Sequence, residues 1–435
     1  MSLDRLFALE TFGIKLGLHN ITRLCEALGH PERSFTTLHV AGTNGKGSVT
    51  AMVHGALVAG GVRAARYISP HLCSLSERFV VGEAAVDDDT LQEVADDVLA
   101  LADRLRHQGV LTVSPTFFEA TTAIAFEIFR RAGVEVAVIE VGLGGRFDAT
   151  NVITPVAGAI TTIAMDHQQH LGSTLAAIAR EKAGIIKPGM TVVAGNLAPE
   201  ALAVIRQIAG EQGAELIEAE RDVLIDAGME EGRARLTLRT PADAYGPVRL
   251  ALRGAHQVGN AVIAVRLLEA ARRAGVDVPR RAIELGLTRT EWPARLELLP
   301  LDNGRQVLID AAHNAEGAQA LATYLKQWHP ERPLLVISVM RDKEVTDILE
   351  RLVPVASDVI ATQAPSPRAI PAAELAEHVR SIQARAGSGA AVSAIADPEE
   401  AVAAALARAP VVCIAGSIFL AGAVRDGLKR RAILH

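Results

Sequence analysis

The sequence has few of the features that several protein classes require. Its 435 residues include only three cysteines, Cys25, Cys73 and Cys413, which lie far apart and lack metal-ligand spacing. This usage favours a reducing compartment. No basic cluster stands out, and 44 basic against 50 acidic residues give a net charge of −6. The chain therefore lacks the electrostatic footprint of a nucleic-acid-binding protein.

Long apolar runs are also missing. The opening MSLDRLFALE carries acidic residues where a signal peptide needs an apolar core. The longest uncharged apolar stretch, 409–424, is short for a membrane span and contains Pro410 and Gly416. We therefore expect a cytoplasmic protein that has neither a membrane nor a nucleic acid as partner.

Aromatic residues are scarce, at 3%, although 49% of the chain is hydrophobic. The cores must be built from Ala, Val, Leu and Ile, as is usual where helices cover parallel sheets. Continuous apolar runs at 35–40, 134–141, 156–163 and 190–195 predict strands buried on both faces, and 48–61 predicts a helix. Between 215 and 253 polar and apolar residues alternate, which predicts hairpins at a sheet edge.

The pattern breaks around TRTEWPARLELLPLDNGR, where Trp292-Pro293 and Gly304 supply turn chemistry. Apolar runs at 306–311, 333–340, 358–364 and 410–416 follow, each with a helical pattern behind it. The sequence therefore predicts an α/β protein of two domains. Residues 1–295 form a P-loop-type, mostly parallel sheet with helices on both faces. Residues 296–435 form a smaller Rossmann-like α/β domain.

The stretch HVAGTNGKGS carries three glycines around one lysine, between a predicted strand and a predicted helix. Such a loop offers backbone N–H groups and a helix N-terminus to a phosphate, with Lys46 adding charge and Ser48 a hydroxyl. The pattern G-x-x-x-x-G-K-[ST] is not fully met, because Val40 stands where its first glycine belongs and Gly47 follows the lysine. An ordinary glycine-rich turn therefore stays open.

Polar side chains follow three further strands. Ser69 lies in YISPHL, Glu140 ends the strand of VIEVGLGGRFDATN, and Asp166 and His167 follow the strand of IAMDHQQHLG. In open α/β sheets ligands bind beyond the carboxyl ends of the strands, which favours a common site. Taken singly, each of these residues is more simply a turn residue, a solvated charge or a hydrogen-bonded loop residue.

The chain resembles the folylpolyglutamate synthases and dihydrofolate synthases, a branch of the Mur ligase superfamily. The motifs GTNGKGS, SPHL, EVGLGGRFDATN, MDH, EKAGIIKPG, WPARLE, DAAHN and GSIFLAG follow that family in order and spacing. The resemblance implies an ATP-dependent ligase that adds L-glutamate to a folate, or to dihydropteroate, through an acyl phosphate, releasing ADP and phosphate. It also implies Mg²⁺ and a monomer. A monovalent cation such as K⁺ is a further expected cofactor.

The resemblance assigns roles at the first sheet. Lys46, His167 and Lys182 would be catalytic, and Ser69, Glu140 and His167 would bind metal. Lys182 has the family's spacing for a lysine carbamylated by CO₂, which requires a neutral amine and hence a lowered pKa. The simpler alternative is that Lys182 or Lys187 caps the C-terminal end of a helix, where its charge makes a favourable contact with the helix dipole. The residues expected to bind ATP are Gly42, Thr43, Asn44, Gly45, Lys46, Gly47, Ser48, Asn260, Arg295 and Asp310.

Further residues are assigned to the substrates. By resemblance Arg146 and Asp148 belong to the substrate loop, and His313 lines the cleft. Lys343 and Ser417 would hold the carboxylates of the incoming glutamate. Without the family, Asn260 is as readily a polar helix residue, and Arg295 and Lys343 are surface cations. Glu119 begins an apolar helix, where capping is favoured over a pterin-site role.

Two other functions remain as alternatives. One is a Mur-type ligase acting on a nucleotide-linked muramic acid. Only about 38 residues precede HVAGTNGKGS, too few for a separate nucleotide-sugar domain. The other is a P-loop nucleotide switch without ligase activity. Such a switch has no need of Ser69, Glu140, His167 and Lys182.

Overall fold

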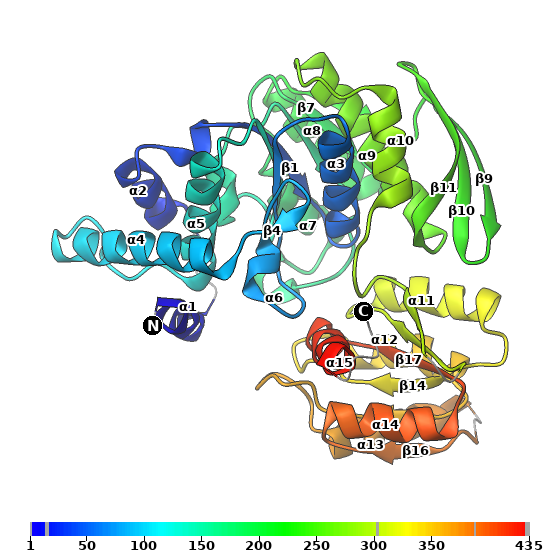
Figure 1. The fold of residues 1–435 in the computed structure, drawn as a ribbon. Helices are drawn as coiled ribbons and strands as arrows, with labels where there is room; N and C mark the ends of the chain where they lie inside the picture. Colours follow the sequence, from blue (N-terminus) through cyan, green and yellow to red (C-terminus); the bar gives the residue numbers. More distant parts are fainter. Residues whose placement is uncertain (1, 14–16, 302–303, 387–388, 431–435) are drawn as a thin grey trace.

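The structure is a computed structural model that describes residues 2–13, 17–301, 304–386 and 389–430. Figure 1 shows two bodies joined by a single linker, with the chain passing from the upper body to the lower one. Among the helices in the described ranges, none combines the length and apolar character needed to cross a bilayer.

The upper body is built on an eight-stranded sheet. Its strand order is β4-β3-β2-β5-β1-β6-β7-β8, and all pairs from β2 to β8 are parallel. The antiparallel pairs β2–β3 and β3–β4 form one edge. The strands are β1 (Thr36–Ala41), β2 (Ala64–Tyr67), β3 (Phe79–Val81), β4 (Ala84–Ala85), β5 (Val136–Glu140), β6 (Ala157–Ile160), β7 (Thr191–Ala194) and β8 (Glu215–Glu218).

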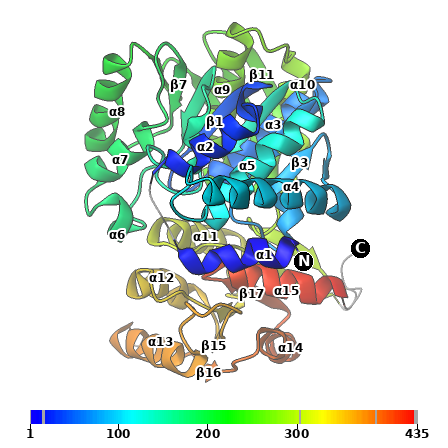
Figure 2. The ribbon, with the colours of Figure 1, turned by 90° about the vertical axis from the view of Figure 1, so that its left-hand side faces the viewer.

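Helices cover both faces of this sheet because its central strands are apolar on both sides. Leu38 and Val138 pack in the cluster under α3, α9 and α10, whereas Ala137 and Ile139 pack toward α4 and α5. Helices α7 and α8 cover the neighbouring part of that second face. Figure 2 shows these layers from the side. The helices are α1 (Ser2–Ala8), α2 (His19–Ala27), α3 (Lys46–Ala59), α4 (Asp88–His107), α5 (Phe117–Arg131), α6 (Gln168–Leu171), α7 (Leu175–Ala183), α8 (Pro199–Glu211), α9 (His256–Arg273) and α10 (Arg280–Arg289).

The alternating segment 215–253 folds differently from the expectation. Its hairpins are present, but β9 (Leu224–Glu230), β10 (Arg233–Arg239) and β11 (Ala244–Arg253) form a separate antiparallel sheet. Only β8 joins the edge of the large sheet, in a parallel pair with β7. The separate sheet is stable because Leu236, Leu238 and Leu250 bury their side chains in the cluster with α9 and α10. Placing all these hairpins at a sheet edge was therefore wrong.

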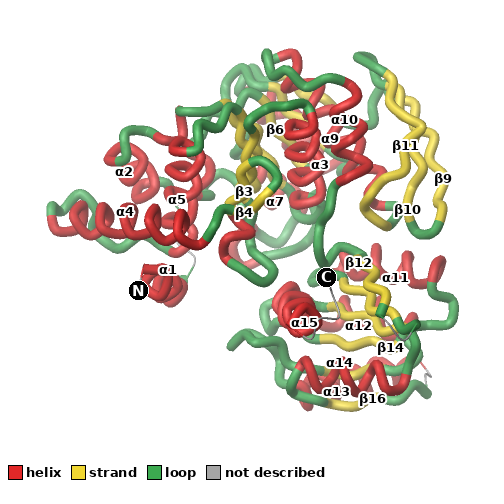
Figure 3. Tube along the Cα trace, in the orientation of Figure 1, coloured by secondary structure: helices red, strands yellow, loops and turns green. Residues whose placement is uncertain are grey.

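The lower body contains a six-stranded sheet of order β12-β13-β17-β14-β15-β16, parallel except for β12. Helices α11, α12 and α13 pack on one face, and α14 and α15 on the other (Figure 3). The elements are β12 (Glu297–Pro300), β13 (Gln306–Ile309), α11 (Ala315–Trp328), β14 (Leu334–Ile337), α12 (Val345–Leu352), β15 (Val359–Ala361), α13 (Ala372–Ala386), β16 (Val392–Ala394), α14 (Pro398–Arg408), β17 (Val411–Ala415) and α15 (Ile418–Arg430). The predicted α/β class, with a mostly parallel first sheet, is confirmed.

Close packing of α3 against α10 holds one face of the first sheet. A Cβ at Gly286 would lie 2.6 Å from the Met52 carbonyl oxygen and 2.7 Å from Ala56 Cβ. Gly286→Ala is therefore expected to lower the free energy of unfolding by about 1–3 kcal/mol through overpacking. Denaturant unfolding followed by circular dichroism measures it.

Gly210, near the exposed end of α8, is the matched control because a Cβ there has no neighbour within 4 Å. Gly210→Ala is expected to be neutral or to stabilise by about 0.5–1 kcal/mol, since alanine loses less backbone entropy in a helix. Equal effects of the two substitutions would contradict this packing account.

Candidate active site

The strand order brings four loops together at the carboxyl ends of the central strands of the first sheet. Strands β2, β5, β1 and β6 are neighbours and run parallel, so their carboxyl ends lie side by side. Ser69 follows β2, Glu140 ends β5, the loop Gly42–Ser48 follows β1, and Asp166 and His167 follow β6. Residues separated by as many as 125 positions in sequence, from Gly42 to His167, therefore meet at one end of the sheet.

The loop Gly42–Ser48 requires glycine at two positions. Gly42 has φ 149°, and a Cβ there would overlap the Thr161 hydroxyl. Gly45 has φ 83° and precedes the first turn of α3, where a side chain would collide with Asn260. The backbone is thereby left open at the N-terminus of α3, where the helix dipole favours an anion.

Two lysine amines meet in this loop, Lys182 buried and Lys46 partly buried. Lys46 Nζ donates to the carbonyl oxygens of Gly42 and Thr43, both at 3.1 Å. Lys182 Nζ donates to the same Gly42 oxygen at 2.8 Å. Burial lowers the pKa of Lys46. Burial, together with repulsion from Lys46, lowers the pKa of Lys182 to about 7. A large share of Lys182 is thus neutral near pH 7, whereas a solvated lysine stays charged.

Glu140 is a buried carboxylate facing this positive charge. Its side chain has no hydrogen bond or ion pair within the described part of the chain, and burial raises its pKa to about 7, against the opposing effect of Lys46 and Arg295. Ser69 is half-buried two residues beyond β2. Both offer oxygen atoms, which are the ligands that Mg²⁺ prefers. Within the described ranges, no three His, Cys, Asp or Glu side chains gather into a metal-binding group.

Asp166 links the two bodies. Its Oδ1 accepts a 2.6 Å ion pair from Lys343 Nζ, and both side chains are only 8% exposed. Its other oxygen accepts from Asn314 Nδ2 at 3.3 Å and lies 3.7 Å from His313 Nε2. Burial works to raise the pKa of Asp166, but the Lys343 ammonium and the neighbouring histidines hold it well below the usual range. The cluster brings Lys343 and His313 of the lower body to the loop after β6.

His167 belongs to the same cluster. It adopts a left-handed conformation, with φ 49°, at the start of α6, and its Nε2 lies 3.3 Å from Lys343 Nζ. Burial, then the charge of Lys343, lowers its pKa to about 4. The imidazole is therefore neutral near pH 7 and keeps a lone pair for a cation.

A second bridge runs from the phosphate loop to α11. Asn44 Nδ2 donates to Glu316 Oε2 and, at 3.3 Å, to Asn314 Oδ1. Asn314 Nδ2 donates in return to Asn44 Oδ1 at 3.0 Å. Sequence reasoning assigned no role to Asn314 or Glu316. The only available signal was that Asn314 stands before a helical pattern, where it caps α11 by accepting from Gly317 N.

The residues predicted to bind the nucleotide lie on both sides of the linker. Asn260 Nδ2 donates to Gln257 Oε1 at 2.9 Å, and Gln257 donates to Ser48 Oγ at 3.3 Å. Arg295 lies between the left-handed residues Ala294 (φ 56°) and Leu296 (φ 48°).

Asp310 fastens the linker to the lower body. Its carboxylate accepts from Leu296 N at 2.8 Å and from Ala312 N at 2.9 Å. Burial raises the pKa of Asp310, and the charge of Arg295 opposes that rise. Ala311 N donates to Ala294 O at 2.9 Å, which adds a backbone contact between the linker and the lower body.

The side chains of the predicted substrate loop are held by hydrogen bonds within the loop and by an ion pair to α7. Asp148 accepts from Leu143 N at 2.8 Å and from both the N–H and the hydroxyl of Thr150. Arg146 pairs with Glu181 at 2.6 Å, and its guanidinium lies 4.3 Å from the Phe147 ring centroid.

Three other predicted residues are also placed by local bonds. His313 Nδ1 lies 2.9 Å from Ala311 O. Ser417 is buried between β17 and α15, where its hydroxyl accepts from Phe419 N. Glu119 accepts from Thr116 N at 2.7 Å in a capping box of α5, which is the capping role favoured above. The functional roles of Arg146, Asp148, His313 and Ser417 stay predictions.

Two family models match the chain. The Mur ligase middle domain matches residues 98–268, and the Mur ligase glutamate ligase domain matches residues 294–418. A curated folylpolyglutamate synthase of Lacticaseibacillus casei is 35% identical over 421 residues, 95% of either chain.

Solved structures agree with this over nearly the whole chain. A Mycobacterium tuberculosis folylpolyglutamate synthase complexed with ADP and AMPPCP superimposes with a TM-score of 0.89 at 33% identity, covering 98% of both chains. Escherichia coli FolC in complex with DHPP and ADP gives a TM-score of 0.87 at 27% identity, covering 99% of this chain and 98% of that one.

The Asp166–Lys343 pair should be strongly coupled because both partners are buried. Removing either partner, as in Asp166→Asn or Lys343→Met, leaves an uncompensated charge and is expected to cost about 3–5 kcal/mol of unfolding free energy. The double variant should cost less than the sum, with a coupling energy of about 1–3 kcal/mol from a double-mutant cycle in urea. Because the pKa of Asp166 is lowered, the coupling persists above about pH 4 and is lost at lower pH.

The pair Arg5–Asp103 is the control, since it has the same 2.6 Å separation but side chains 54% and 46% exposed. Its coupling energy is expected to stay within about 0–1 kcal/mol. Equal coupling of the two pairs would overturn the interpretation of Asp166 as a bridge.

Proposed function

Because the chain belongs to the folylpolyglutamate synthase and dihydrofolate synthase branch of the Mur ligases, we propose that it joins L-glutamate to folates and to dihydropteroate. It is an ATP-dependent ligase of this family. The observation that carries the proposal is that two neighbouring loops of the first sheet contact the lower body: Asn44 of the loop Gly42–Ser48 bonds Asn314, and Asp166 bonds Lys343. A ligase needs both a phosphate site and a second-substrate site, and the Asp166–Lys343 ion pair joins them.

We propose residues 1–295 and 296–435 as the two domains. The six-stranded sheet begins at Glu297, just after Arg295, and this supports the division. ATP would lie between them, with its phosphates along Gly42, Thr43, Asn44, Gly45, Lys46, Gly47 and Ser48. Asn260 of α9, Arg295 of the linker and Asp310, which bonds the linker at Leu296, would hold the adenosine and the phosphates. The substrates are small molecules, and one chain supplies every residue of the site, so we propose a monomer.

The reaction must bring a carboxylate anion to a polyanionic phosphate. In the proposed first step the γ-phosphoryl group passes to the acceptor carboxylate, giving an acyl phosphate and ADP. The amine of glutamate then attacks the activated carbonyl, and phosphate leaves as the amide forms. Lys46 at the loop supplies fixed positive charge, which costs no reorganisation during the reaction.

Ser69 and Glu140 fit a magnesium site. The Glu140 carboxylate is buried and has no protein partner within the described ranges, so a cation with phosphate oxygens would complete its surroundings. Mg²⁺ bound there supplies charge neutralisation between the phosphates and the acceptor. His167, with its neutral imidazole, would serve a second cation in exchange for its present contact with Lys343. K⁺ as a further cation is a proposal that rests on the family resemblance alone.

The acceptor and glutamate sites are assigned to the loops around Asp166 and to the lower body. Lys343 and Ser417 are proposed to meet the glutamate carboxylates. His313, which lies with Lys343 at Asp166, is assigned to the wall of the cleft between the two bodies. Arg146 and Asp148 are assigned to the acceptor loop, Asp148 by holding the loop conformation through its three hydrogen bonds. We propose that the enzyme acts in the cytoplasm, where its three free cysteines would stay reduced.

Turnover should depend on all three substrates. In an ADP-release assay that crosses tetrahydrofolate and dihydropteroate with L-glutamate, ADP is expected only when glutamate and an acceptor are both present. Lys46→Ala is expected to reduce kcat by at least about 100-fold, since it removes a fixed positive charge from the phosphates.

Lys326→Ala, on the exposed side of α11, is the control and should retain full activity. ADP release that does not depend on glutamate would favour a nucleotide switch and contradict the ligase. A near-normal rate of Lys46→Ala would contradict the loop assignment.

Lys182 is proposed to be carbamylated by CO₂. Its lowered pKa, about 7, makes the neutral amine available that this reaction requires. With ¹³C-bicarbonate, a carbamate resonance is expected in the parent enzyme and in Lys187→Arg, and it should vanish in Lys182→Arg. Activity of the parent should fall when CO₂ is depleted, more steeply below pH 7 than above. A resonance that survives Lys182→Arg would assign the carbamate elsewhere.

A further inference from the structure

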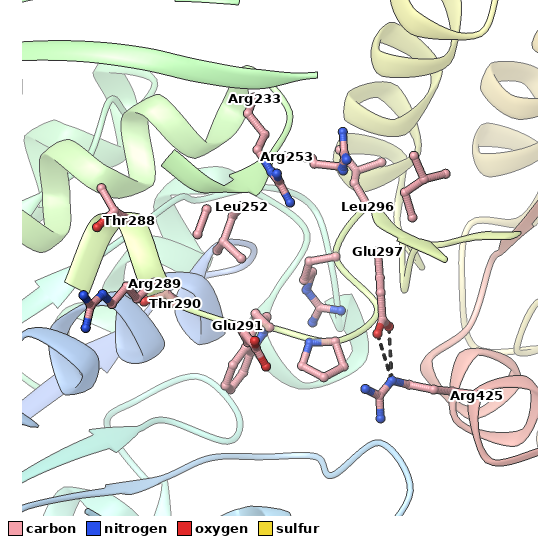
Figure 4. A pocket seen from close by; sticks show the side chains of 15 residues that line it. Arg233, Leu252, Arg253, Thr288, Arg289, Thr290, Glu291, Leu296, Glu297 and Arg425 are labelled. Carbon is pink, nitrogen blue, oxygen red and sulfur yellow. Dashed lines mark hydrogen bonds and ion pairs between the residues drawn. The ribbon is translucent and has the colours of Figure 1, made fainter. Parts of the chain in front are cut away.

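A cavity of about 580 Å³ lies behind the linker, between the three-stranded sheet and α15 (Figure 4). Its size falls within the range of about 300–1,000 Å³ that is usual for small-molecule sites. Both domains contribute to its walls: Arg233 and Arg253 come from β10 and β11, Arg295 from the linker, and Arg425 from α15.

The cavity is strongly cationic. Five of its lining residues are arginines, and only Glu291 and Glu297 carry negative charge. Glu297 is already engaged, because its oxygens accept from Arg425 Nε at 3.0 and 3.2 Å and from Ala294 N at 2.9 Å. Glu297 is therefore not available to balance the charges of Arg233 and Arg253, which line the cavity from β10 and β11.

Arg233 is the least compensated of these arginines. Its Nε is buried and has no hydrogen-bond partner, and no ion pair to it occurs within the described ranges. It stands directly opposite Arg253 in the β10–β11 register. Like charges directly opposite on neighbouring strands are unfavourable. Figure 4 shows the two guanidinium groups close together at the cavity. Burial, then repulsion from Arg253 and Arg249, also lowers the pKa of Arg233.

The arrangement suits an extended anion better than a compact one. The charges lie on three separate elements, β10–β11, the linker and α15, rather than around one backbone cradle such as Gly42–Ser48. Arg253 Nη1 donates to Glu231 O at 2.7 Å and Arg295 Nη1 to Ala294 O at 2.9 Å, but neither has an ion pair within the described ranges. Arginine binds carboxylates through two parallel hydrogen bonds, so guanidinium groups that lack a carboxylate partner along a wall match a chain with one carboxylate per unit. The proposed reaction generates such a chain, because each added glutamate leaves one more α-carboxylate on the product.

We propose that this cavity binds the γ-linked oligoglutamate tail of the product through Arg233 and Arg253. The proposal rests on the proposed function for the source of the tail. Since Arg295 lines the cavity and is also assigned to the nucleotide, a tail held there lies next to the nucleotide site and touches both domains.

The test uses the full-length chain and penta-γ-glutamate without a folate group. The protein has two tryptophans, and Trp292 lines the cavity. Trp328→Phe removes the other one, whose Nε1 is buried without a partner, and leaves Trp292 as the only tryptophan reporter. Calorimetric titration in this background measures affinity. The indole of Trp292 also lies against Gly47 of the loop Gly42–Ser48, so its fluorescence reports binding near the linker, and the arginine variants identify the cavity as the place of binding.

Binding is expected to perturb Trp292 and to weaken at least tenfold in Arg233→Ala and in Arg253→Ala, with salt weakening it further. Arg239→Ala, exposed at the other end of β10, should bind within twofold of the parent. Thermal unfolding checks that each variant is folded, and two independent arginine variants keep the test decisive if one is not.

Three results would overturn the proposal: unchanged affinity in both cavity variants, equal loss in Arg239→Ala, or binding without a Trp292 response. A parallel titration with tripolyphosphate separates the two polyanions. If only tripolyphosphate binding depends on Arg233, the cavity is a phosphate site and the tail assignment fails. Failure of the glutamate-dependent ADP assay with intact Arg233-dependent binding would instead refute the proposed reaction and leave the subsite standing.

Discussion

Two lysine amines, one buried and one partly buried, share a single carbonyl oxygen, and this is the constraint on which the site depends. Lys46 and Lys182 both donate to Gly42 O, and neither has a hydrogen-bonded carboxylate within the described residues. Such an arrangement persists only if an anion compensates it or one amine gives up its charge. The phosphate assignment supplies the anion. The lowered pKa of Lys182 supplies the second route, since that amine is the one able to become neutral and react with CO₂.

The fold places a carboxyl group next to these amines because neighbouring parallel strands end side by side. Parallel strands β2, β5, β1 and β6 end at one edge, so Glu140 arrives beside the loop without any long side chain reaching across. The lower domain completes the site from the other side through Asp166–Lys343 and Asn44–Asn314. The linker between the two bodies holds Ala294 and Leu296 in left-handed conformations, which are costly for residues other than glycine.

Much of this could be predicted from the sequence, but not all. Apolar runs identified the central strands, and the glycine pattern identified the loop, because both signals are local. Strand β12, which pairs with β13, was not predicted. The hairpins of β9–β11 were predicted, but their separation from the large sheet was not, because it depends on packing against α9 and α10. Asn314 and Glu316 were missed for the same reason: the partner of Glu316, Asn44, lies 272 residues away. Asp148 was assigned to the substrate, but in the structure its carboxylate accepts hydrogen bonds from Leu143 and Thr150 of its own loop.

The central claim is that the edge of the first sheet holds a nucleotide polyphosphate with a divalent cation beside Glu140. Anomalous diffraction from crystals grown with AMPPCP and Mn²⁺ tests it most directly. The account predicts a manganese peak within about 2.0–2.3 Å of a Glu140 oxygen, with the phosphates against Lys46. A peak remote from Glu140, or phosphates away from the loop Gly42–Ser48, would contradict it.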